Sequence, residues 1–119
     1  MAEFHNLRDR VVVVGVGTTA YGSFPETDEY GLAAEAFRNA LDDCGLDKSK
    51  VDGLLTCRIP SYSRVGETLG LDPRWTITLP GHGRMSGIGL VEATIALATG
   101  QANYVALLYA NIEIGRAHV

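Results

Sequence analysis

Short apolar runs that alternate with helical patterns constrain the fold of this 119-residue chain most strongly. The run Arg10–Gly17 is rich in valine and has no polar alternation, which is typical of a strand buried on both faces of a parallel sheet. Further strands are predicted over Val51–Cys57, Trp75–Leu79 and Tyr104–Tyr109. Helical patterns fill the intervals. The order β-α-β-α-β-α-β therefore predicts an α/β fold with a mainly parallel, mixed sheet.

Three segments carry the helical pattern. In the first, Asp28 is a suitable N-cap and Gly45 marks the C-terminal end. The apolar positions between them recur at three- and four-residue spacing and are Leu32, Ala33, Ala36, Phe37, Ala40 and Leu41. A short helix is predicted over Arg64–Leu69. Ser86–Thr99 combines large apolar residues with several glycines and alanines, which predicts a central helix buried on most sides.

Composition excludes several classes of protein. The net charge is −4, and acidic and basic residues are mixed along the chain, so no basic stripe for nucleic acid is present. The apolar stretches are too interrupted for a membrane span, which needs about 20 apolar residues, and residues 1–6 do not resemble a signal peptide. Cys44 and Cys57 are far apart and form no metal-binding pattern. We expect two reduced thiols and a cytoplasmic location.

The segment Leu79–Gly87 is the candidate site, because a strand end and a glycine-rich turn there lead into the apolar helix. Many α/β enzymes present a nucleophile at such a helix N-terminus, where backbone N–H groups and the helix dipole stabilise negative charge. The turn has no cysteine, and Ser86 has one histidine on the wrong side of the turn and no evident acid. No catalytic residue is therefore assigned, and the candidate pocket residues are Gly81, His82, Gly83, Arg84, Met85 and Ser86.

Each candidate also has a structural interpretation. His82 is an acid–base group, an anion contact, or a turn residue that forms hydrogen bonds with the local backbone. Arg84 is either an anion contact or a solvated or subunit-interface arginine. Gly15–Ala20 matches the dinucleotide pattern G-x-G-x-x-A, but no helix follows it directly, which favours a strand that leaves the core through a turn. Cys57 is interpreted as structural, because no helix begins there to lower its pKa.

The C-terminal residues do not follow the α/β pattern. Glu113–Val119 (Glu-Ile-Gly-Arg-Ala-His-Val) corresponds codon by codon to a widely used sequencing adapter, GAG ATC GGA AGA GCA CAC GTC. We expect residues 1–112 to be an incomplete N-terminal domain and residues 113–119 to be a non-native tail. Other codons in the source nucleotide sequence would remove this argument.

Three stretches of the chain resemble the N-terminal part of thiolase-superfamily proteins. They are Val11–Gly22, Tyr30–Leu54 without the intervening 47–50, and Ser86–Ala106. The resemblance is best to the lipid-transfer-protein or acetyl-CoA acetyltransferase-like branch, which is similar to sterol-carrier-protein-x thiolases. It covers about Arg10 to Asn111 and implies a thiolase-like fold.

The resemblance also implies which chemistry is missing. In classical thiolases the central helix opens with Cys-x-x-Gly, and the cysteine takes up the acyl group. Alignment on Gly87 places Arg84 at the cysteine position, and a slip of one residue places Gly83 or Met85 there. None of these residues can form an acyl thioester. The family's other catalytic groups belong to its C-terminal half.

Two classes of function follow from the resemblance. In the first, the full-length protein acts on acyl-CoA thioesters in lipid or steroid side-chain metabolism, as an acyltransferase-like enzyme or by retro-aldol cleavage without a cysteine nucleophile. In the second, it is a non-catalytic subunit that binds CoA esters or serves as a scaffold. The resemblance further implies that the full-length protein is a homodimer, which pairs through the strand Trp75–Leu79 and the buried helix Ser86–Thr99. It also implies a possible separate partner with an OB-fold and a zinc ribbon. The CoA thioester is a substrate, no covalently bound cofactor is expected, and we expect the chain alone to be inactive.

Overall fold

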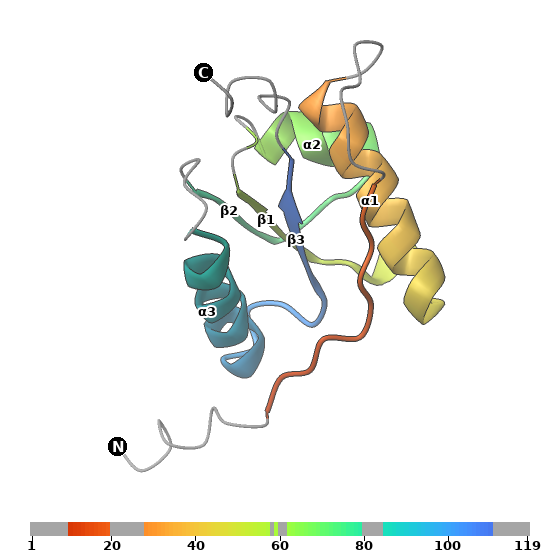
Figure 1. The fold of residues 1–119 in the computed structure, drawn as a ribbon. Helices are drawn as coiled ribbons and strands as arrows, with labels where there is room; N and C mark the ends of the chain where they lie inside the picture. Colours follow the sequence, from red (N-terminus) through yellow and green to blue (C-terminus); the bar gives the residue numbers. More distant parts are fainter. Residues whose placement is uncertain (1–9, 20–27, 58, 60–61, 80–84, 111–119) are drawn as a thin grey trace.

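The computed structural model describes residues 10–19, 28–57, 59, 62–79 and 85–110 (Figure 1). Three helices and three strands follow one another as α1 (Glu29–Cys44), β1 (Gly53–Cys57), α2 (Tyr62–Leu69), β2 (Trp75–Leu79), α3 (Met85–Ala98) and β3 (Val105–Tyr109). A short 3-10 turn, η2 (Lys48–Lys50), precedes β1 and was not predicted from the sequence. Helices α1 and α2 lie on one side of the sheet, and α3 lies on the other.

The three described strands form a parallel sheet in the order β2-β1-β3. Leu55 of the central strand lies opposite Ile77 of β2 and Leu107 of β3. All five residues of β1 are buried, as expected for a strand with neighbours on both sides and helices over both faces. The predicted α/β fold with a parallel sheet is confirmed.

Alternation along β1 divides its side chains between two layers. Leu54 belongs to the main core, which it forms with residues of α1, α2 and β3, among them Phe37, Val65 and Leu108. Leu55 faces α3 instead, because a Cβ built on Gly89 of that helix would lie 3.0 Å from Leu55 Cδ2. Glycine at this position lets α3 approach the sheet closely.

The ends of α1 confirm the capping prediction. The Asp28 carboxylate accepts a hydrogen bond from the Gly31 backbone N–H at 2.9 Å. Gly45 ends the helix with a φ of +70°, a conformation that glycine adopts at little cost. The other helices and strands also lie where they were predicted: α2 begins two residues earlier than expected, and β2 has the predicted bounds.

The predicted first strand, Arg10–Gly17, is wrong. Residues 11–19 form no strand, and β1 pairs directly with β3. The segment is instead held on α1: Val16 N–H donates to the Asp43 carboxylate at 2.9 Å, and the Asn39 side chain donates to the Thr18 carbonyl at 2.9 Å. A Cβ on Gly17 would clash with the Ala36 carbonyl oxygen, so glycine is needed for this close contact with the helix.

In the described structure helix α3 is buried along one face only, contrary to the predicted burial on most sides. Gly89, Ala93 and Ala96 are buried. Four large apolar residues of the helix point elsewhere and are exposed, namely Ile88, Leu90, Val91 and Ile95. In the part of the chain that the structure describes, no helix is both long and apolar enough to span a bilayer.

Candidate functional site

The carboxyl ends of the three strands lie at one edge of the sheet. Cys57 at the end of β1 pairs with Leu79 of β2 on one side and with Tyr109 of β3 on the other. Helix α3 begins at Met85, six residues after the end of β2. Ligands of open parallel sheets bind beyond the carboxyl ends of the strands. The fold thus directs the chain from the end of β2 through the predicted turn and into α3.

Most of the candidate pocket residues fall on the connection itself. Gly81, His82, Gly83 and Arg84 lie outside the described residues. Met85 and Ser86 form the first turn of α3. Their position agrees with the expectation that this helix opens at the candidate site, and the roles of all six residues remain predictions.

Cys57 lies under α3 at the same edge of the sheet. The residue is fully buried, and a Cβ on Gly89 would lie 3.4 Å from its Sγ. A thiol that is closed off by a helix has no access to a substrate from solvent. The structural interpretation of Cys57 therefore fits its surroundings.

A hydroxyl pair links β1 and β2 one residue before their ends. The Thr56 hydroxyl donates to the Thr78 hydroxyl at 3.1 Å, and Thr56 is completely buried. Such cross-strand threonine pairs stabilise adjacent strands. This pair was not predicted, although both threonines are the second-last residues of predicted strands.

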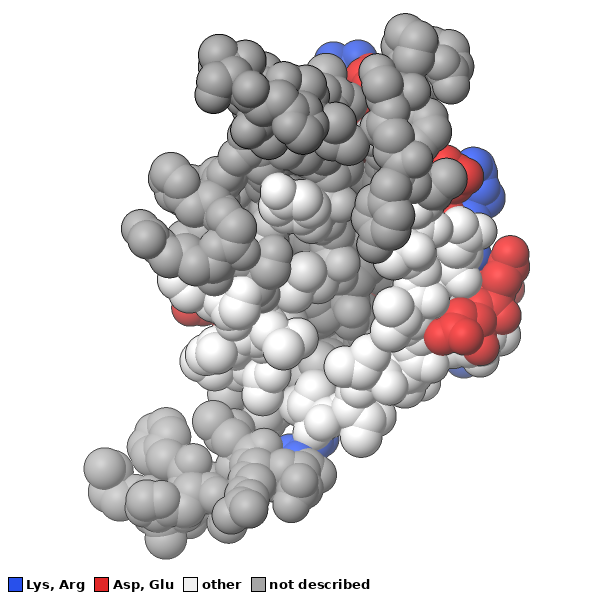
Figure 2. All heavy atoms as spheres, viewed as in Figure 1, with Lys and Arg blue, Asp and Glu red and all other residues white. Residues whose placement is uncertain are grey.

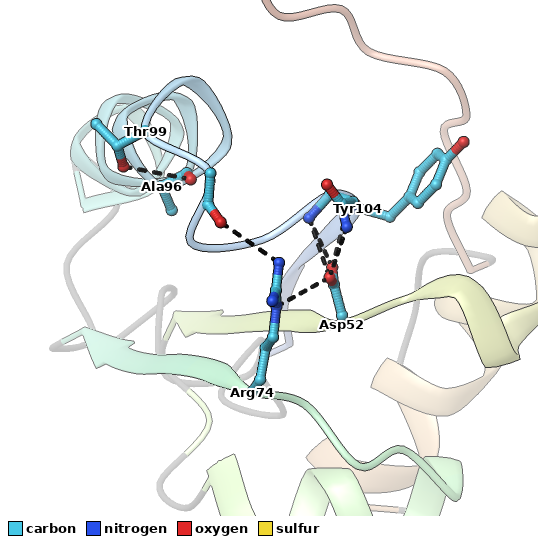
Figure 3. Close-up of polar contacts among 7 residues, drawn as sticks. Asp52, Arg74, Ala96, Thr99 and Tyr104 are labelled. Atoms are coloured by element: carbon cyan, nitrogen blue, oxygen red, sulfur yellow. Dashed lines mark hydrogen bonds and ion pairs between the residues drawn. The ribbon is translucent and has the colours of Figure 1, made fainter.

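The most connected polar group lies at the opposite edge of the sheet, where the strands begin (Figure 3). The Asp52 carboxylate accepts hydrogen bonds from the backbone N–H groups of Asn103 and Tyr104, both at 2.9 Å. Arg74 forms an ion pair with it, with 3.3 Å between Nε and Oδ2, and also donates to the Gly100 carbonyl at 3.4 Å. Residues that precede all three strands thus meet at one carboxylate.

The surroundings of Asp52 favour its charged form. Burial acts to raise its pKa, but the N–H groups of Tyr104 and Asn103 and the Arg74 guanidinium outweigh this effect, so the pKa lies below its usual value. The carboxylate is far along the strands from the candidate pocket edge, and we assign it a structural role. Little in the sequence indicated this role, because Asp52 shows there only as an acidic residue directly before an apolar strand.

No metal site is evident in the described part of the chain. Nowhere in residues 10–19, 28–57, 59, 62–79 and 85–110 do three His, Cys, Asp or Glu side chains come together as a metal ion would require.

Two curated proteins resemble this chain in sequence. No protein-family model matches the chain. The chain is 33% identical over 96 residues to the steroid side-chain-cleaving aldolase of Thermomonospora curvata. This alignment covers 78% of the chain and 25% of the aldolase. It is 31% identical over 102 residues to the 17-hydroxy-3-oxo-4-pregnene-20-carboxyl-CoA lyase of Mycobacterium tuberculosis, covering 83% of this chain and 26% of that protein.

Solved structures share this fold. The Ltp2-ChsH2(DUF35) aldolase superposes with a TM-score of 0.74 and 32% identity, covering 84% of this chain and 27% of the other. The SCP2-thiolase-like protein type 1 of Mycobacterium smegmatis superposes with a TM-score of 0.69 and 26% identity, covering 82% and 22%. The chain thus has a thiolase-like fold. It spans about a quarter of the length of the curated relatives that it matches.

Proposed function

We propose that residues 1–112 are the N-terminal part of a longer thiolase-superfamily protein that cleaves a carbon–carbon bond of an acyl-CoA thioester by retro-aldol chemistry. The observation that supports this most strongly is that the chain has no cysteine between Thr78 and Val119 from which α3 could present a thiol. The names of two relatives agree with it, since one is a side-chain-cleaving aldolase and the other a carboxyl-CoA lyase.

The chemistry proposed for such a site needs no covalent intermediate. A base takes the proton of the β-hydroxyl group, and the oxygen forms a carbonyl with the β-carbon as the Cα–Cβ bond breaks. The electron pair of that bond moves to the α-carbon and forms the enolate of the thioester. The carbonyl compound is released, and protonation of the α-carbon completes the shortened acyl-CoA. The reaction therefore requires a base and N–H donors for the enolate oxygen, rather than a nucleophile.

Residues Gly81 to Ser86 are proposed to line the acyl pocket. Backbone N–H groups at the start of α3 are suited to the enolate oxygen, because the first turn of a helix has unpaired donors. His82 is the candidate acid–base group and Arg84 the candidate contact for an anionic group. The principal base is proposed to lie in the remainder of the longer protein.

We further propose that the longer protein forms a homodimer and binds a separate partner protein. β2 is an edge strand of the described sheet, as a strand that pairs with its counterpart in a homodimer must be. A two-protein aldolase among the structural relatives supports a separate partner protein, for which an OB-fold with a zinc ribbon was expected. We also propose a cytoplasmic location and a non-native origin for residues 113–119.

The uninterrupted gene provides the test. The longer protein, with and without the product of the neighbouring gene, is incubated with a β-hydroxyacyl-CoA. We expect release of a carbonyl compound and a shortened acyl-CoA, and no acyl adduct on residues 80–87 by mass spectrometry. Tight binding of the thioester without turnover would favour the non-catalytic subunit instead. An acyl adduct in this segment would contradict the proposed mechanism.

A further inference from the structure

Tyr109 is the last residue of β3 and lies at the carboxyl edge of the sheet, level with Cys57 and Leu79. Directly paired residues of neighbouring strands point to the same face of a sheet. Leu79 and Cys57 point towards α3, because a Cβ on Gly89 of that helix would lie 3.3 Å from Leu79 Cδ1 and 3.4 Å from Cys57 Sγ. The Tyr109 side chain is therefore on the α3 face, whereas Leu108 before it belongs to the main core on the other face.

Tyr109 is the open member of this row of three side chains. Cys57 is completely buried, whereas 44% of Tyr109 is exposed. Within the part of the chain that the structure describes, the Tyr109 hydroxyl forms no hydrogen bond. The phenol therefore does not hold these elements together, and its hydroxyl is left for a ligand.

Helix α3 brings its first turn to the same edge of the sheet. Its other end lies at the opposite edge, where the Gly100 carbonyl accepts a hydrogen bond from Arg74 at 3.4 Å. The helix thus runs from the carboxyl ends of the strands towards their amino ends. Met85, its first residue, lies about 6 Å before Gly89 along the helix axis. The N–H groups of this first turn have no partner within the helix, so backbone donors and a phenol come to one edge.

Few charged groups lie between α3 and α1. Figure 2 shows mostly uncharged side chains there, while acidic and basic groups lie at the margins of the view, chiefly beside α1. Glu92 is the only charged residue of α3 and lies about two turns after Met85. Neutral N–H and O–H groups are therefore the described donors that could stabilise a negative charge at the start of α3, and such hydrogen bonds are strong in a site that excludes water.

We infer that the Tyr109 hydroxyl lines the acyl-CoA pocket and donates a hydrogen bond to the thioester oxygen as that oxygen takes up the charge of the enolate. The inference rests on the proposed function. Tyrosine hydroxyls are among the side chains that stabilise oxyanions in this way, and an acceptor-only role is not required of a group that carries a proton. The phenol keeps its proton throughout, and the base that acts on the β-hydroxyl group is a different residue.

Removal of the hydroxyl tests the inference in the longer protein. Tyr109→Phe keeps the ring. Tyr104→Phe is the matched control, because Tyr104 is exposed to 39% and directly precedes the other end of the same strand. We expect Tyr109→Phe to lower kcat for cleavage of a β-hydroxyacyl-CoA by about 100-fold, the usual effect of one lost oxyanion donor. KM should change little, since the hydrogen bond strengthens in the transition state. Tyr104→Phe should leave both constants unchanged, and both variants should melt at the temperature of the parent.

Nitration of tyrosine by tetranitromethane gives a second measurement, which needs no turnover. The probe is an acyl-CoA without a β-hydroxyl group, which keeps the thioester oxygen but cannot undergo retro-aldol cleavage. At about ten times its Kd, it should slow the nitration of Tyr109 in the longer protein about tenfold, because the ring reacts only in the unliganded fraction. The nitration of Tyr104 should not change. Peptide mapping separates the two sites.

The outcomes distinguish this inference from the proposed function. An unchanged kcat of Tyr109→Phe, in a protein that cleaves the thioester, would overturn the inference and leave the proposed function standing. Protection of Tyr109 in a protein without cleavage activity would support Tyr109 as a pocket residue and overturn the proposed reaction. Equal nitration of Tyr109 with and without the acyl-CoA, or no nitration in either state, would overturn the inference whatever the activity.

Discussion

At the scale of single residues, Asp52 determines how the strands begin. Its carboxylate receives N–H groups from Asn103 and Tyr104, 51 and 52 residues along the chain, and faces Arg74 from the β2 side. Its own backbone carbonyl accepts from Arg74 N–H at 2.9 Å. One residue thus holds the amino ends of all three strands in the observed register.

Replacing this carboxylate is expected to destabilise the chain. Asp52→Asn keeps the size of the side chain but removes the charge and one acceptor oxygen, and should cost about 1–3 kcal/mol because charge-assisted hydrogen bonds to backbone N–H groups are lost. Urea unfolding measures the difference. Asp42→Asn, on the exposed side of α1, is the matched control, and an equal effect of both substitutions would refute the structural role.

The same residue predicts a pH dependence. In the folded chain the backbone N–H groups of Tyr104 and Asn103 and the Arg74 guanidinium hold the pKa of Asp52 below the usual value of an aspartate. Its contribution to the free energy of unfolding is therefore complete above the unfolded pKa and is lost as the pH falls through the folded pKa. The difference in stability between the parent and Asp52→Asn should shrink on acidification from about pH 6 to below pH 4. A difference that is constant over this range would contradict the prediction.

At the scale of elements, the glycines of α3 have different surroundings. Gly89 faces Leu55, Leu79 and Cys57, whereas a Cβ on Gly87 would meet nothing within 4 Å. The helix therefore packs on the sheet through Gly89, and Gly87 lies on its exposed side.

This contrast gives a matched pair of substitutions. Both Gly87→Ala and Gly89→Ala gain helix propensity, but only the second places a methyl group 3.0 Å from a fully buried leucine. We expect Gly89→Ala to be less stable than Gly87→Ala by about 1–3 kcal/mol, the usual cost of overpacking. Thermal unfolding compares them, and equal midpoints would show that Leu55 yields without strain.

The elements also show what the sequence could establish. Where a periodic pattern coincided with a cap, as in α1 between Asp28 and Gly45, both ends were predicted correctly. The run Arg10–Gly17 was misassigned because β-branched residues indicate an extended chain but do not identify the neighbour with which it pairs. The role of Gly17 depends on the backbone of α1, and that of Asp52 on the meeting of three strands, so neither could be read from local sequence. The turn Gly81–Arg84 stays a prediction.

At the scale of the whole molecule, exposed apolar surface and unpaired strand edges are the features that most affect behaviour in solution. β2 and β3 are edges of the described sheet, and α3 leaves four large apolar side chains uncovered. Such edges and patches favour association.

We therefore expect the 119-residue chain to self-associate at micromolar concentration, as measured by sedimentation velocity. The association should weaken in low concentrations of urea, which solvates apolar surface. A monodisperse monomer that melts cooperatively would contradict this expectation. The longer protein proposed above serves as the comparison.

The attachment of the segment 15–18 to α1 also has a mechanical consequence. Because Val16 and Thr18 are bonded to Asp43 and Asn39, a force applied at the amino terminus would act first on the surface of α1. The two hydrogen bonds to Asp43 and Asn39 would therefore be the first contacts to carry a load that enters from that end.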